Sequence, residues 1–184
     1  MIRVLSGHSN AVRAVAISPD DTWIATASSD GTARLWNTDS SKRATIKGHK
    51  EGLTAVAISP DGTWLATTSH DDTVRLSSAD RTEHTTITVH PESELPYPVY
   101  SIHTVAISPD SSWFATGSFD GTARFWNSDG TPRATLTGHT ETVYGIAISS
   151  DGTWLATASH DGTARLWNSN GIDVTDSTLS YSVG

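Results

Sequence analysis

The segment TWIATASSDGTARLWN, residues 22–37, returns almost unchanged as TWLATASHDGTARLWN at residues 153–168. The two stretches differ only at Ile24/Leu155 and Ser29/His160, which is far beyond chance. Self-similarity at a period of a few tens of residues is the mark of repeat architectures, and it decides the fold before local propensities do. We therefore interpret the chain as tandem copies of one ancestral unit.

Two recurring residues give the period of the unit. The first is a histidine, usually preceded by glycine, with intervals of 41, 41 and 49 residues: His8, His49, His90 and His139. The second is a turn aspartate, with intervals of 41, 49 and 41 residues: Asp30, Asp71, Asp120 and Asp161. An eight-residue insertion therefore lies between His90 and Asp120. These markers predict units at about 1–41, 42–82, 83–131 and 132–172, followed by a tail at 173–184.

Each unit reads as four strands. Residues 12–18 and 23–28 alternate with period two around a Pro-Asp turn, which is typical of a hairpin. The Asp30-Gly31 turn leads into a third strand at 32–37, and a fourth follows at 43–46. Because no stretch shows sustained helical periodicity, the predicted class is all-β, with one four-stranded antiparallel sheet per unit.

The order of these motifs resembles the WD40 family. The shared features are Gly-His, a strand, Ser-Pro-Asp-Gly, a second strand, Asp-Gly-Thr and Leu-Trp-Asn, and they cover residues 1 to about 172. The resemblance implies a β-propeller with four blades per chain. The chain departs from the family's Trp-Asp ending by using Asn37, Asn127 and Asn168. A larger departure is Ser77, which stands where the other units have tryptophan.

The resemblance also implies a buried hydrogen-bond chain in each blade, made by the histidine, a Ser/Thr of the second strand, the turn aspartate and the third-strand tryptophan. Donor and acceptor capacities of these groups match, so the chain can be satisfied. Because Ser77 lacks the indole, blade two should be the weakest. The expected members are His8, Thr26 (or Ser28), Asp30 and Trp36; His49, Thr67 and Asp71; His90, Thr116, Asp120 and Trp126; and His139, Thr157 (or Ser159), Asp161 and Trp167.

The two ends of the repeat array are complementary. Met1–Leu5 aligns with the fourth strands of later units, whereas the tail after residue 172 no longer matches that pattern. The N-terminal strand should therefore complete the last blade, either of the same chain or of a neighbour, and so remove an open edge. Outer strands of blades about 90° apart would splay by roughly 20 Å more than the inner ones, against roughly 11 Å at about 45°. Because the wider wedge is harder to fill, we expect a two-fold homodimer of eight blades, with a closed four-bladed monomer as the alternative.

A candidate partner surface follows from the family resemblance. In similar propellers, the loops before the first strand and between the second and third strands share one face that grips peptides. The corresponding positions vary between otherwise near-identical units, as expected either of a recognition surface or of solvated loops. They are Arg13, Ser29, Thr54, His70, His103, Phe119, Tyr144 and His160.

The insertion at residues 91–100 falls on the same predicted face. Three prolines stiffen it, and Leu95, Tyr97 and Tyr100 offer apolar contacts. It is either a docking loop or a tolerated insertion.

Composition narrows the function. A net charge of −8 disfavours nucleic acid and anionic membranes. The chain has no cysteine, which excludes disulfides and thiolate zinc sites and suits a reducing compartment, and its apolar runs are too short to span a bilayer. We therefore expect a cytoplasmic protein without a cofactor.

The sequence supports a binding scaffold better than it supports an enzyme. Serine, histidine and aspartate would suit a hydrolytic triad, but a catalytic set is needed once and this one recurs in every unit. His70, His103 and His160 could bind a metal, but they belong to different blades. The leading hypothesis is a platform that binds a protein or peptide. The rivals are a sensor segment of a nucleotide-binding switch system, for which no phosphate-binding motif is present, and a small-molecule binder or enzyme that uses the central channel.

Overall fold

The computed structural model describes residues 2–80, 84–91 and 101–172, with only the backbone described at residue 84. Across these residues the chain forms fifteen strands and no helix, as the sequence predicts. The strands are β1 (Val12–Ile17), β2 (Trp23–Ser28), β3 (Ala33–Asn37), β4 (Lys42–Ile46), β5 (Leu53–Ile58), β6 (Trp64–Ser69), β7 (Thr73–Ser78), β8 (His84–Thr88), β9 (Ile102–Ile107), β10 (Trp113–Ser118), β11 (Ala123–Asn127), β12 (Pro132–Leu136), β13 (Val143–Ile148), β14 (Trp154–Ser159) and β15 (Ala164–Asn168).

Consecutive strands pair into four antiparallel sheets, β1–β4, β5–β8, β9–β12 and β13–β15. The hairpin between the first two strands is held by side chains of the turn. In the first sheet, the Ser18 hydroxyl donates to Asp20 at 2.6 Å and accepts from the backbone N–H of Trp23 at 3.0 Å. The same serine–aspartate contact recurs in the other sheets. Short local hydrogen bonds thus fix the turn at this end of every sheet.

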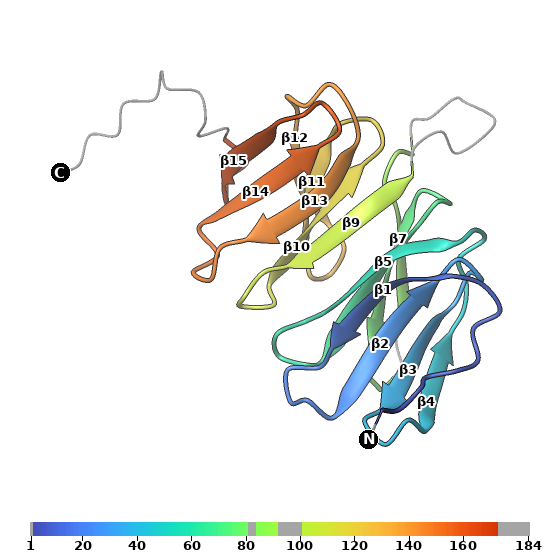
Figure 1. Cartoon of the computed structure of the whole chain (residues 1–184). Helices are drawn as coiled ribbons and strands as arrows, with labels where there is room; N and C mark the ends of the chain where they lie inside the picture. Colours follow the sequence, from blue (N-terminus) through green and yellow to red (C-terminus); the bar gives the residue numbers. More distant parts are fainter. Residues whose placement is uncertain (1, 81–83, 92–100, 173–184) are drawn as a thin grey trace.

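The sheets follow one another along an arc (Figure 1), and each first strand contacts the first strand of the next sheet. Apolar side chains pack between neighbouring sheets rather than within one. One cluster joins Leu35 and Ala25 of the first sheet to Leu53 and Leu65 of the second, and two similar clusters fill the following interfaces. This packing is the blade-on-blade arrangement of a propeller.

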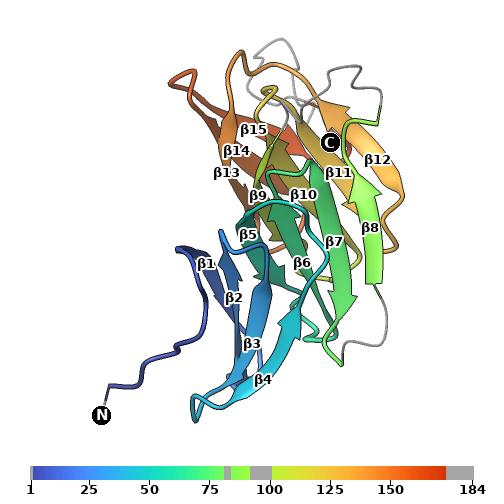
Figure 2. The same ribbon diagram turned by 90° about the vertical axis from the view of Figure 1, so that its right-hand side faces the viewer.

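The four sheets form an open arc, and closure of the ring, as a four-bladed monomer or as an eight-bladed dimer, stays a prediction. Within the described residues the last sheet has three strands, and residues 2–8 belong to no strand, so the expected N-terminal strand is not formed in this structure. These residues extend away from the first sheet (Figure 2) and leave 95% of Ile2 exposed. Two of these residues return to that sheet: the Arg3 guanidinium donates to the backbone carbonyl of Thr38 at 2.5 Å, and the His8 ring contacts Asp30 and Thr26.

Both ends of the arc expose residues that are buried inside it. Trp154, on the free face of the last sheet, is 45% exposed, whereas the equivalent Trp23 is 3% exposed. At the opposite end Val12 is 52% exposed, whereas the equivalent Leu53 is 1% exposed. Each terminal sheet therefore exposes one of the two surfaces that pack together between neighbouring blades inside the arc.

Candidate functional site

The repeated polar residues meet at one end of each sheet. In the first, His8 Nδ1 lies 2.9 Å from the Asp30 carboxylate and His8 Nε2 lies 2.9 Å from Thr26 Oγ1. The indole N–H of Trp36 donates to the same hydroxyl at 2.9 Å. A neutral imidazole with its proton on Nδ1 satisfies every link, since the hydroxyl can donate to Nε2 while it accepts from the indole. Of the two expected hydroxyls, Thr26 is the one that makes these bonds.

The last sheet repeats this arrangement. His139 lies 2.8 Å from both Asp161 and Thr157, and Trp167 donates to Thr157 at 2.9 Å. Ser159, the other expected hydroxyl of this blade, instead accepts a hydrogen bond from the backbone N–H of Asp161 at 3.1 Å and so stabilises the turn. The network is thus a means of anchoring the loop before the first strand to the two central strands.

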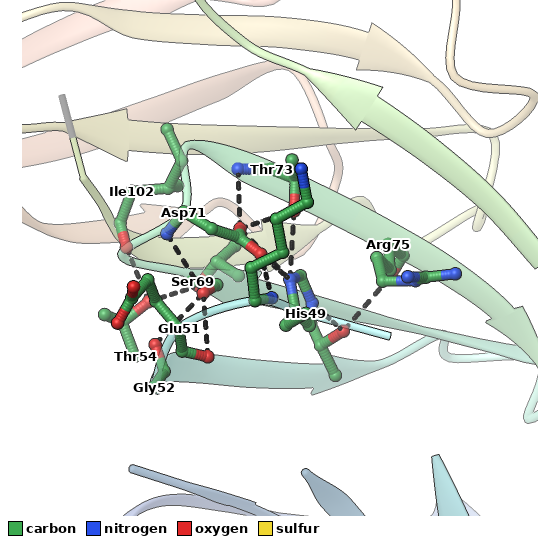
Figure 3. A network of polar contacts seen from close by, with 12 residues as sticks. His49, Glu51, Gly52, Thr54, Ser69, Asp71, Thr73, Arg75 and Ile102 are labelled. Atoms are coloured by element: carbon green, nitrogen blue, oxygen red, sulfur yellow. Dashed lines mark hydrogen bonds and ion pairs between the residues drawn. The ribbon is translucent and has the colours of Figure 1, made fainter. Parts of the chain in front are cut away.

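The second sheet has the same contacts without the indole (Figure 3). His49 lies 3.2 Å from Asp71 and 3.0 Å from Thr67, and Thr73 donates to Asp71 at 2.6 Å. Ser77, at the tryptophan position, is buried. Thr67 therefore receives no indole N–H here.

The third sheet departs from the expected arrangement. Trp126 still donates to Thr116 at 3.0 Å, but His90 turns to carboxylates on either side. Its Nδ1 lies 2.6 Å from Asp72 of the second sheet, and its Nε2 lies 3.0 Å from Asp120 of its own. Burial alone would lower the pKa of His90, but the hydrogen bonds that its ring donates to Asp120 and Asp72 outweigh burial and raise that pKa. His90 therefore links the two blades through carboxylates that favour its protonated form.

Hydrogen bonding keeps the four turn aspartates ionised. Burial opposes ionisation of Asp30, Asp71 and Asp120, yet bonds from the neighbouring threonine and histidine lower their pKa well below the usual value. The pKa of Asp161 is lowered mainly by its bond from Thr163. These carboxylates act as fixed acceptors, which is a structural role rather than that of a general acid.

Five of the eight variable residues line up beside this network. The ring centres of His70 and His103 are 5.9 Å apart, those of His103 and Tyr144 are 4.9 Å apart, and those of Tyr144 and His160 are 6.2 Å apart. Thr54 lies next to this row, because its hydroxyl donates to the backbone carbonyl of Ile102, the residue before His103, at 2.5 Å. We call Thr54, His70, His103, Tyr144 and His160 the recognition row; it crosses three blades.

A hollow of about 300 Å³ opens at one end of the row, lined by Arg13, Thr54, His70 and His103. Arg13 is held there by its bond from Nε to Ser29 Oγ, at 2.8 Å. Burial, and then the neighbouring His70, lower the pKa of His103. The hollow thus combines the guanidinium of Arg13 with two imidazole side chains, and the environment of His103 favours its neutral form.

The other predicted surface residues are less closely grouped. Phe119, at the end of β10, is 48% exposed, and Tyr144 of the row is 55% exposed. Leu95, Tyr97 and Tyr100 of the insertion lie outside the described residues. Among the described residues, no three His, Asp or Glu side chains are placed to hold a metal, so His70, His103 and His160 do not form such a site. No helix in the described part of the chain is long and apolar enough to cross a membrane.

Asp72 is the residue that sequence reasoning missed. It stands where Gly31, Gly121 and Gly162 occur in the other units, and it shares their left-handed backbone, with φ of 62°. The replacement of glycine by aspartate was visible in the sequence. It could have indicated a special role for Asp72, because glycine adopts the left-handed backbone conformation more easily than aspartate does.

The arrangement of the sheets identifies the structural class of the protein. Four successive antiparallel sheets, packed face to face in an arc and anchored by the same polar network, are those of a tandem-repeat protein of propeller type. The family model described as WD domain, G-beta repeat matches residues 1–37, 40–76, 84–127 and 130–168. The chain therefore belongs to this WD40 family, whose repeats generally mediate protein–protein interaction and are typically non-enzymatic. A comparison with curated proteins found no match.

Proposed function

We propose that the chain is a non-catalytic protein-binding scaffold and that the recognition row, with Arg13, Ser29 and Phe119, contacts its partner. The observation that carries this proposal is the continuity of the row across three blades. Its members vary between units whose other residues are nearly identical, and they meet in space.

The chemistry of this surface suits a peptide or protein. Exposed aromatic side chains beside an arginine are the residue types enriched at interaction hot spots. Tyr144 offers both an apolar ring and a hydroxyl, and Arg13 offers a cation whose position is set by Ser29. The insertion residues Leu95, Tyr97 and Tyr100 are proposed to extend the same surface.

The test is selection of peptides from a random displayed library on the wild-type protein, followed by affinity measurements with three variants. In the first, Arg13, Phe119 and Tyr144 are all changed to alanine. We expect the selected peptides to lose at least about tenfold in affinity, since two or three hot-spot truncations cost more than 1.4 kcal/mol in total.

The second variant is the matched control. Pro60→Ala combined with Ser150→Ala changes exposed residues at the opposite ends of the strands and should leave affinity unchanged. In the third, residues 92–99 are removed, which tests the insertion. Equal affinity of wild type and the triple variant would refute the recognition row, and equal affinity of wild type and the deletion variant would refute the docking role of the insertion.

We also propose that two copies join as an eight-bladed, two-fold ring in which residues 1–5 of each copy add a fourth strand beside β15 of the other. The exposed end faces support this, because each repeats one side of an internal blade interface. The exposed side chains of Ile2 and Val4 support it as well, because the segment is free to add to a blade of the other copy. A cytoplasmic location completes the proposal, because a chain without cysteine suits a reducing compartment.

A further inference from the structure

An arginine covers the first tryptophan of two blades. The guanidinium carbon of Arg43 lies 5.4 Å from the ring centre of Trp23, and that of Arg133 lies 5.7 Å from the ring centre of Trp113. Both tryptophans are buried. The protein thus shows twice how a guanidinium stacks on the indole at the start of a second strand.

The second blade has the tryptophan without this arginine. In the sequence, EHTTI at residues 83–87 aligns with KRATI at 42–46 and PRATL at 132–136, so histidine stands at the arginine position. The register differs too, because β4 and β12 carry an irregularity at the arginine, whereas β8 pairs with β7 without one. Trp64, unlike its two counterparts, is partly exposed.

A cavity of about 620 Å³ opens beside Trp64, between the second and third blades. Its lining includes Leu76 and Thr85 from the second blade and Ser111 and Asp129 from the third. Asp61, in the turn before Trp64, is a second carboxylate at this cavity. The cavity therefore combines an indole, small polar groups and two acidic side chains.

Both carboxylates are available as anions. Burial works to raise the pKa of Asp61, but hydrogen bonds from Ser59 and Thr63 outweigh it and lower that pKa. Bonds from the backbone and side chain of Thr131 lower the pKa of Asp129. An indole face beside carboxylates is the environment that a guanidinium prefers, since it can stack and pair at the same time.

We infer that this cavity is a binding site for an arginine side chain of a partner polypeptide, which stacks on Trp64 as Arg43 and Arg133 stack on their own tryptophans and pairs with Asp129. The site lies at the ends of the strands opposite the recognition row. It is therefore independent of that row, and either can fail without the other.

The probe is an acetylated and amidated Gly-Arg-Gly peptide, titrated into the full chain while the indole N–H resonance of Trp64 is followed by NMR. Trp64→Phe assigns that resonance. We expect a saturable shift with the arginine peptide, and binding weaker by at least about tenfold when neutral citrulline replaces arginine. Free arginine is titrated in a separate experiment. It should bind more weakly than the peptide, because the proposed ligand is an arginine side chain within a polypeptide.

Two variants test the geometry. Asp129→Asn should weaken binding by about tenfold, because it removes the paired charge but keeps an oxygen for Thr131. Asp39→Asn is its matched control, since Asp39 holds the equivalent hairpin in the first blade through Ser41 and lies away from Trp64.

Four results would overturn the inference. The first is an unshifted Trp64 resonance in the folded protein, and the second is equal binding of the citrulline peptide. The third is binding that occurs only after Arg81→Ala, because the cavity would then belong to an arginine of the same chain. The fourth is binding that survives Asp129→Asn unchanged, because the peptide would then bind elsewhere.

Discussion

Asp72 shows how one residue can link two repeats. At the other three equivalent positions glycine adopts the left-handed turn conformation without a side chain, whereas Asp72 adopts it and reaches His90 of the next blade. The histidine in turn faces Asp120 of its own blade, and Arg124 opposes its charge. Backbone strain at Asp72 is thus offset by an ion pair that the other blade junctions lack.

We predict that Asp72→Gly lowers the pKa of His90 toward its ordinary value, because one of two carboxylate partners is lost. A histidine whose folded pKa is raised stabilises the fold below its unfolded pKa of about 6.5, and this contribution is lost as pH rises through the folded value. Stability of the wild type should therefore fall as pH rises above about 6.5 and passes through the raised pKa of His90, and the variant should show a smaller fall. NMR titration of His90 and urea unfolding over a series of pH values measure these effects. An unchanged His90 titration in the variant would contradict this link between the blades.

At the scale of the single blade, the hydroxyl of the second strand is the centre of the network. Thr157 serves both His139 and Trp167, whereas Thr67 serves His49 and has no indole partner because Ser77 replaces the tryptophan. The two threonines are equally buried. They therefore form a matched pair that isolates the contribution of the indole bond.

We predict that Thr157→Val destabilises the protein by about 1–3 kcal/mol, because two buried groups lose their partner, and that Thr67→Val costs less. Chemical denaturation of both variants measures the difference. Equal losses would show that the indole bond adds nothing and that the missing tryptophan does not make blade two weaker.

At the scale of the whole molecule, the open arc leaves apolar faces uncovered at both ends. Exposed Trp154 and Leu166 lie on one terminal sheet and exposed Val12, Val15 and Ile17 on the other. Burial of apolar surface is the main driving force of association. In a two-fold ring, each copy would bury both of its end faces against the other copy.

We predict that the chain has a mass of twice 19.6 kDa by light scattering. Ile2→Asp combined with Val4→Asp should convert it to the monomer, because these positions align with Ala44 and Ile46, which are buried in β4, and an unpaired carboxylate is costly to bury. Ser150→Ala serves as a surface control that should leave the dimer intact. A wild-type monomer would refute the ring, and a dimer that withstands the Ile2 and Val4 changes would refute the exchanged strand.

Much of the fold could be read from the sequence because it is local. The period, the alternation of apolar residues and the Asp-Gly turns predicted the strands of each sheet, and β2 and β6 begin at the tryptophans and end at the serines of the repeated motif. The family resemblance named the partners of His8 and His139. It did not reveal that His90 would turn to Asp72, because that contact joins two units and depends on how their sheets pack.

What the sequence by itself determined is the blade, since its strands, turns and polar anchors arise from residues within about forty positions of one another. What only the tertiary structure decided is everything between blades: the link through His90, the alignment of His70, His103 and Tyr144, the cavity at Trp64 and the uncovered end faces. The physical reason is that these features depend on the spacing and angle of neighbouring sheets, which side-chain packing sets and no local pattern records.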